Sequence, residues 1–267
     1  MSLTLFLLAV LFTGSLIVWL QLVMRWRAQK EILPLNAEPR ALWRSAAQMA
    51  VAYVALLYAV SHLVPLFISS GATEHPVVDR NIVAQHVALN IGLTIILILA
   101  LISRRRPGSE YGITSAQLRD QIRVGILGFL TAVLPMACSM AATIPLRGPE
   151  SQHALLKLLM ETSDPTTVLL VALLAAVSVP LLEELLFRVI LQGFLTTFIP
   201  ASASITVVAV LFALVHGWRN GLALLPLALI LGYVFHRRHS YLAVVVIHSL
   251  FNATMLVLQL LIPPTAR

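Results

Sequence analysis

Charged side chains are scarce in this sequence. Aspartate, glutamate, lysine and arginine make up 11% of its 267 residues, whereas a soluble domain carries roughly twice that share. Hydrophobic residues make up 59%, and apolar runs of about twenty residues, the length of a transmembrane helix, recur along the chain. The short alternating segments of a membrane β-barrel are missing. The composition therefore predicts an all-α fold, a polytopic helix bundle in a membrane.

Cysteine is nearly absent too, because Cys138 is the only one. A single thiol forms no internal disulfide, and a chain without a cysteine pair has no cysteine-based structural zinc site. Acidic residues number 11 against 18 basic ones, a net charge of +7. The basic residues gather at the ends of the apolar runs, where they orient membrane helices and meet anionic headgroups. We therefore expect membrane lipid as a partner and no nucleic acid.

About eight transmembrane helices are expected along the apolar runs. Their approximate ranges are 3–24, 45–69, 82–102, 115–146, 165–198, 202–216, 221–235 and 241–262. The distribution of basic residues places the N-terminus outside. We expect the protein to be an integral protein of a bacterial cytoplasmic membrane. We divide the chain into N-terminal helices over 1–164, with about four spans plus interfacial segments, and a C-terminal helical unit over 165–262.

Three ionisable side chains lie deep in the fifth run, at Glu183, Glu184 and Arg188. Each charge at membrane depth is disfavoured by roughly 3 kcal/mol on insertion scales, so the cluster needs a reason. Glu184 and Arg188 share a helical face, and an ion pair that fixes helix packing explains them as well as a functional role does. Glu183 points about 100° away and is left over for chemistry. Pro180 is expected to kink or break the helix just before it.

His216 ends the sixth run, one helical turn after Phe212, so the two share a face. By itself, a histidine at a helix end is more often a cap or an interface residue. However, the turn near Pro200 lies seventeen residues after Glu183 and sixteen before His216. If both arms are helical, the two side chains lie at nearly the same depth, about 25 Å from the turn. This register predicts that Glu183 and His216 meet.

His248 and Asn252 are also four residues apart, on the eighth run. Both donate hydrogen bonds, and both are unfavourable in lipid without a partner. On its own, the pair is best explained as a polar clamp between helices. Together with Glu183 and His216, a shared intramembrane polar cavity becomes the better explanation.

The basic loop before the eighth run contains two further histidines, His236 and His239. We expect both of them to be solvated. Tyr241 begins the eighth run and fits an interfacial anchor. None of these three residues is predicted to belong to the site.

Three motifs on apolar runs together resemble one known family. They are Glu183-Glu184-x-x-x-Arg188, Phe212-x-x-x-His216 and His248-x-x-x-Asn252. The family is CPBP, which comprises CAAX prenyl endopeptidases and bacteriocin-processing proteins and is also called the ABI family of glutamate intramembrane proteases. The resemblance covers the last third of the chain, and the first four runs agree with the family only in general character.

The resemblance implies an endopeptidase that hydrolyses a membrane-associated or prenylated peptide without metal or other cofactor. Glu183 would act as general base on a water that His216 helps to hold. His248 and Asn252 would form the oxyanion hole, where preset donors supply several kcal/mol of stabilisation. Supporting roles would fall to Glu184, Arg188 and Phe212.

The sequence leaves other functions open. A zinc hydrolase would use Glu183, His216 and His248 as ligands, although no His-Glu-x-x-His motif is present. A non-catalytic protein of bacteriocin immunity, or a scaffold, would bind a peptide without cleaving it. A transporter would also bury charge, but the two halves of the chain show no repeat. The oligomeric state is not indicated.

Overall fold

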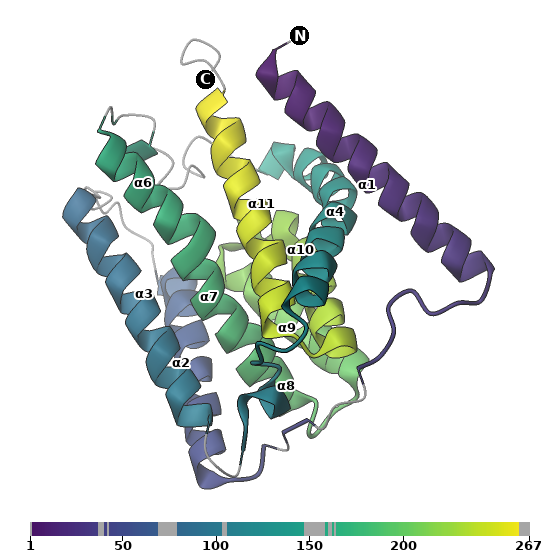
Figure 1. Ribbon diagram of the computed structural model, residues 1–267. Coiled ribbons are helices and arrows are strands. Elements are labelled where there is room, and N and C mark those ends of the chain that lie inside the picture. The colour runs from purple at the N-terminus through teal and green to yellow at the C-terminus, as the bar shows by residue number, and fades with distance from the viewer. Residues whose placement is uncertain are drawn as a thin grey trace.

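The computed structural model describes residues 2–36, 40, 41, 43–68, 79–102, 106–146, 158, 159, 162 and 164–261. Most of these residues are helical (Figure 1). The first helices are α1 (Leu3–Arg27), α2 (Ala46–Ile68), α3 (Arg80–Leu101), η1 (Gly108–Tyr111), α4 (Leu118–Ala142) and η2 (Ile144–Leu146). The last helices are α9 (Ala201–Val215), α10 (Trp218–Arg238) and α11 (Tyr241–Leu261).

Between these groups runs one long helix that changes register twice. Its parts are α6 (Pro165–Leu173), the π-helix η4 (Leu174–Ser178), α7 (Val179–Glu184), the π-helix η5 (Leu185–Gln192) and α8 (Gly193–Leu195). The carboxylate of Asp164 caps its start by accepting hydrogen bonds from two backbone N–H groups, and Pro165 occupies the first turn. The sequence predicts that Pro180 kinks or breaks this helix, but the helix continues through it. Instead, the backbone passes through π-helical turns on either side of α7.

The predicted polytopic helix bundle is confirmed. Within the described part of the chain, six helical segments are long and apolar enough to cross a membrane. They are Leu3–Arg27, Arg80–Leu101, Leu118–Ala142, Pro165–Leu195, Asn220–Arg238 and Tyr241–Leu261. Two more apolar helices occur where the sequence predicts them. One is α9, whose 15 residues extend only about 22 Å against a hydrocarbon core of about 30 Å. The other is α2, which has 23 residues and is apolar over Gln48–Tyr58.

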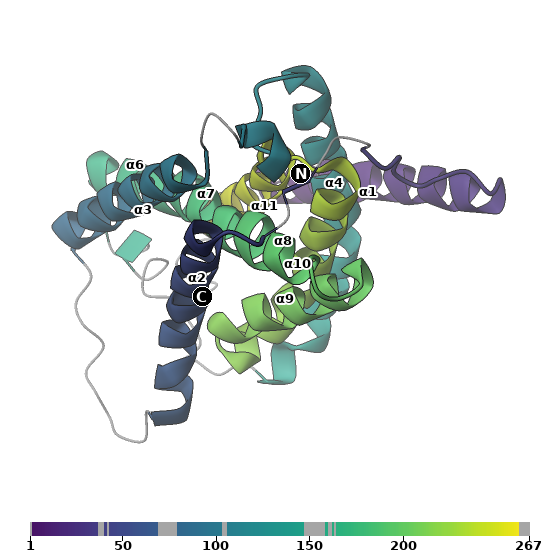
Figure 2. The same ribbon diagram turned by 90° about the horizontal axis from the view of Figure 1, so that it is seen from below.

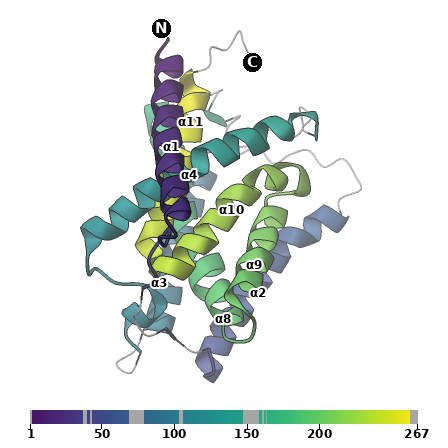
Figure 3. The same cartoon turned by 90° about the vertical axis from the view of Figure 1, so that its right-hand side faces the viewer.

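The long helices pack around a shared core. α1 lies at the edge of the bundle against α4, as Figures 1 and 2 show. On the other side, α3 lies along α6 and α7, while α2 packs on η5 and α9. α4 packs against both α10 and α11, and α10 lies beside α9 (Figure 3). Most of the buried aliphatic and aromatic side chains form one cluster, to which both halves of the chain contribute. A smaller second cluster lies between α3, α6, η4 and α11.

The turn between α10 and α11 is buried, which differs from the solvated basic loop that the sequence predicts. His239 is 6% exposed, and its Nε2 donates a hydrogen bond to a backbone carbonyl of η1 at 3.0 Å. His236 is half-buried. Tyr241 is no interfacial anchor, because its ring is buried and its hydroxyl donates to the carbonyl of Leu181 at 2.6 Å. The start of α11 therefore lies deep in the bundle, beside α7.

Candidate active site

Three predicted site residues converge from three helices. Glu183 lies near the end of α7, His216 caps the end of α9, and His248 lies about two turns into α11. The Nε2 atoms of His216 and His248 are 3.8 Å and 3.9 Å from Oε2 of Glu183. The predicted register between Glu183 and His216 is thereby confirmed. His248 reaches the same depth because α11 begins inside the bundle, bonded to Leu181.

The orientation of both imidazole rings follows from their Nδ1 atoms. Nδ1 of His216 lies 2.8 Å from the carbonyl oxygen of Phe212, and a carbonyl only accepts, so this nitrogen carries a hydrogen. Nδ1 of His248 lies 2.8 Å from Oε1 of Glu184. Both rings therefore present Nε2 to Glu183. Separations of 3.8 Å and 3.9 Å exceed a direct hydrogen bond and suit a water between the groups.

Glu184 and Arg188 form the ion pair that their spacing predicts. Nε of Arg188 donates to Oε2 of Glu184 at 3.1 Å, and both side chains are 0% exposed. The second carboxylate oxygen of Glu184 accepts the hydrogen bond from His248. Removing one partner from such a buried group leaves the other charge uncompensated, which is strongly unfavourable. The pair therefore connects helix packing to the orientation of a site histidine.

Phe212 occupies the centre of this cluster and is 1% exposed. Its ring centroid lies 4.6 Å from that of His216 and 5.8 Å from that of His248. The guanidinium carbon of Arg188 lies 5.2 Å from the same centroid, within the range of a cation–π contact. Phe212 therefore holds both imidazoles in place by packing and carries no reacting group.

Asn252 bonds to a backbone carbonyl, that of Ala175, which has no backbone donor because residue 180 is a proline. In η4, the N–H of Val179 bonds to the carbonyl of Leu174, five residues back. In that register the carbonyl of Ala175 would receive the N–H of residue 180, which proline lacks. Nδ2 of Asn252 donates to this carbonyl instead, at 2.8 Å. The amide thus clamps α11 to the π-helix, and its second N–H remains for another acceptor.

The buried Oε2 of Glu183 has no hydrogen-bond partner within the part of the chain that the structure describes. Its side chain is 13% exposed and that of His216 is 28% exposed, so the site meets the surface of the protein. The phenol of Tyr58, on α2, lies within electrostatic range of this carboxylate. The arrangement is a partly enclosed carboxylate with two imidazoles facing it.

Three residues near the site were not predicted to belong there. Gln192 lies one turn beyond Arg188, is 1% exposed and donates to the carbonyl of Gly232 at 2.9 Å. Gln192 could have been predicted from the sequence, because it is a polar amide within an apolar run. Tyr58 and Tyr241 carried no such signal, because only the packing of α2 and α11 brings them here.

The fold and the site together define a multi-pass helical membrane protein in which apolar helices gather a glutamate and two histidines. The family comparison agrees with this class. Residues 165–254 match the family model described as Rce1-like, type II CAAX prenyl endopeptidase Rce1-like. This match is consistent with the CPBP family and confirms the resemblance carried by the three motifs. The matched stretch is similar to CAAX-type membrane proteases, which are hydrolases. No curated protein and no solved structure matches the chain.

Proposed function

We propose that this chain is an intramembrane endopeptidase in which Glu183 activates the attacking water. The observation that carries the proposal is the convergence of two Nε2 atoms on Oε2 of Glu183, at 3.8 Å and 3.9 Å. Among the described residues, this carboxylate oxygen has no hydrogen-bond partner. A water held between these three groups lies where a general base can take its proton.

The proposed reaction conserves atoms and protons. Glu183 takes a proton from the water as the hydroxide oxygen bonds to the peptide carbonyl carbon. The tetrahedral intermediate collapses when its C–N bond breaks, and the protonated Glu183 returns the proton to the leaving nitrogen. The products are a carboxylic acid and an amine.

The negative charge of the intermediate needs donors nearby. Asn252 supplies its second amide N–H while the first stays on Ala175. His248 supplies Nε2–H when it is protonated, and Glu184 stabilises the resulting imidazolium through Nδ1. Phe212 and the ion pair of Glu184 with Arg188 then act as positioning residues.

The substrate class follows from the location of the site and from the family description. The site lies on membrane helices, so the scissile bond belongs to a peptide or protein that enters or borders the bilayer. The description of the matched family model is that of a type II CAAX prenyl endopeptidase. We therefore propose lipid-anchored peptides, prenylated ones included, as substrates.

The test is hydrolysis of a fluorogenic peptide with a prenylated Cys-a-a-X end by the full chain in lipid vesicles. Glu183→Gln and His216→Ala are each expected to lower kcat at least about 100-fold, the usual contribution of acid–base catalysis. Glu31→Gln, in an exposed ion pair with Arg237, is the matched control and should leave turnover unchanged. Normal turnover by either site variant would overturn the assignment.

A metal-dependent hydrolase is the second candidate, since the same three side chains are possible ligands. In the ranges that the structure describes, no group of three or more His, Cys, Asp or Glu side chains is arranged to hold a metal. The assay separates the two mechanisms: turnover that a chelator abolishes and zinc restores would indicate the metal, and turnover that resists chelation supports the proposal. A peptide-binding protein without catalysis would keep its biological effect in Glu183→Gln.

A further inference from the structure

Buried polar atoms without a protein partner are concentrated in one short segment. Among the described residues, these side-chain atoms are Glu183 Oε2, Arg188 Nη1, Arg188 Nη2 and Gln192 Oε1. All of them lie between the end of α7 and the end of η5. Buried polar atoms in proteins are nearly always hydrogen-bonded, to protein or to ordered water. Their concentration in one segment therefore indicates that water reaches the interior along this helix.

Two of these residues continue the face that begins with Glu184. Glu184, Arg188 and Gln192 recur every four residues and are 0%, 0% and 1% exposed. Each also has one satisfied contact, because Arg188 Nε donates to Glu184 and Gln192 Nε2 donates to Gly232. The atoms that remain are the two terminal nitrogens of Arg188, which donate hydrogen bonds, and Oε1 of Gln192, which accepts them. A water molecule is small enough to be buried and can both accept from the nitrogens and donate to the oxygen.

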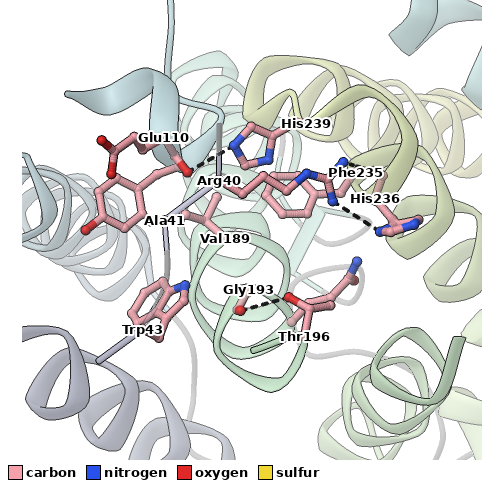
Figure 4. Close-up of a pocket in the computed structure, with 12 residues that line it drawn as sticks. Arg40, Ala41, Trp43, Glu110, Val189, Gly193, Thr196, Phe235, His236 and His239 are labelled. Carbon is pink, nitrogen blue, oxygen red and sulfur yellow. Dashed lines mark hydrogen bonds between the residues drawn. The ribbon is translucent and has the colours of Figure 1, made fainter. Parts of the chain in front are cut away.

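The far end of this face opens into a cavity that is separate from the active site. The cavity measures about 30 Å³, which holds one or two waters. Gln192 lines it, together with residues of η5, α8, α10 and the segments around Trp43 and Glu110. Figure 4 shows Arg40 and His239 on one side of it and Gly193 and Thr196 on the other. Arg40 and Thr196 are partly exposed, so the cavity meets the protein surface.

We propose that internal waters occupy a column from this cavity, past Gln192 and Arg188, to Glu183. The waters satisfy the guanidinium nitrogens of Arg188 and the amide oxygen of Gln192, which no described residue pairs. If the proposed function holds, the column also replaces the water that each hydrolysis consumes. It would do so from the cavity beside Arg40 and His239, independently of the substrate.

The test is radiolytic hydroxyl-radical labelling of the full chain in lipid nanodiscs, since radicals formed from trapped water oxidise adjacent side chains. Phe212 lies beneath Arg188 and Phe235 lines the cavity, whereas Phe129 is similarly buried on α4. Phe212 and Phe235 are expected to be oxidised at least fivefold faster than Phe129. Equal, slow rates for all three would overturn the proposal.

Gln192→Leu tests continuity between the two ends. It is expected to lower the oxidation rate of Phe212 and to lower kcat about tenfold with KM unchanged. The matched control is Gln121→Leu, since Gln121 is another buried glutamine, bonded to Ser240 and to the carbonyl of Thr114, and none of these residues lines the cavity. It should change neither readout. Unchanged Phe212 labelling in Gln192→Leu would contradict a continuous column. If this variant does not fold, the oxidation rates of Phe212, Phe235 and Phe129 in the unaltered chain still test whether the column exists.

The outcome is separable from that of the proposed function. Fast labelling of Phe212 and Phe235 in a chain that cleaves no peptide would leave the column standing and remove the protease assignment. Hydrolysis that depends on Glu183, with Phe212 as slow as Phe129, would do the opposite.

Discussion

Glu183 and Glu184 are adjacent in the sequence and differ in what surrounds them. Glu184 is fully buried and both of its oxygens accept hydrogen bonds, from Arg188 and from His248. Glu183 keeps an unpaired oxygen that faces two imidazoles. One carboxylate is thus fully hydrogen-bonded within the helix bundle, and the other keeps an oxygen for the proposed water. This difference is the physical basis for giving them separate roles.

At this scale, we expect Glu184→Gln to be damaging in two ways. Arg188 loses its counter-charge at 0% exposure, so the free energy of unfolding should fall by about 3–5 kcal/mol. His248 loses its anionic partner, so kcat should fall at least about 100-fold. Denaturation in detergent and the peptide assay measure the two effects.

The double variant Glu184→Gln/Arg188→Met distinguishes these effects. Removing both charges should recover most of the lost stability, while kcat stays low because His248 still has no carboxylate. Recovery of turnover along with stability would show that Glu184 acts through packing alone.

At the scale of a helical element, the long helix from α6 to α8 shows how one proline affects the site. Pro180 leaves the carbonyl of Ala175 without a backbone donor, and Asn252 supplies that donor from α11. The π-helical turns absorb the change of register without breaking the helix. The same contact that repairs the backbone also fixes the position of a proposed oxyanion donor.

This explanation predicts a coupling between Pro180 and Asn252. Asn252→Ala leaves the Ala175 carbonyl unpaired and should lower the free energy of unfolding by about 1–3 kcal/mol. In Pro180→Ala/Asn252→Ala, the new N–H at position 180 can bond to Ala175, so the loss should be smaller than in Asn252→Ala alone. A double variant whose loss equals the sum of the single losses would contradict the proposed repair.

At the scale of the whole molecule, the buried turn between α10 and α11 joins distant parts of the chain. His239 donates to η1, the backbone N–H of Tyr241 donates to Gly112, and Asn36 donates to the backbone of α10. These contacts tie the segments around residues 36 and 112 to the C-terminal helices. Burial and the neighbouring charge of Arg40 lower the pKa of His239 from 6.5 to about 4.

This lowered pKa predicts a pH-dependent stability. As the pH falls below 6.5, the unfolded chain binds a proton at His239 before the folded chain does, so stability decreases between pH 6.5 and about 4. The backbone of His239 is left-handed, with φ 47°, which asparagine also tolerates. His239→Asn should therefore flatten the pH dependence of the detergent-unfolding midpoint over this range. An equally steep dependence in the variant would show that other groups cause it.

Periodicity and spacing were sufficient to predict part of the site. Glu184 and Arg188 pair because four residues bring side chains onto one helical face, and Glu183 meets His216 because the two arms of the hairpin are nearly equal in length. These are local or nearly local relations, which a regular helix determines. The link from His248 to Glu184 and the clamp from Asn252 to Ala175 could not be predicted this way, since they join segments more than sixty residues apart.

The sequence by itself determined the membrane class, the order of the helices and the three motifs, because hydrophobic length and helical period are properties of short stretches. Only the tertiary structure decided how deep α11 begins, which carboxylate is compensated and which polar atoms are left unpaired. Those outcomes depend on the packing of helices against one another, above all on α11 beside the π-helical turns around Pro180. The depth of Tyr241, bonded to Leu181 inside the bundle, brings His248 to Glu183.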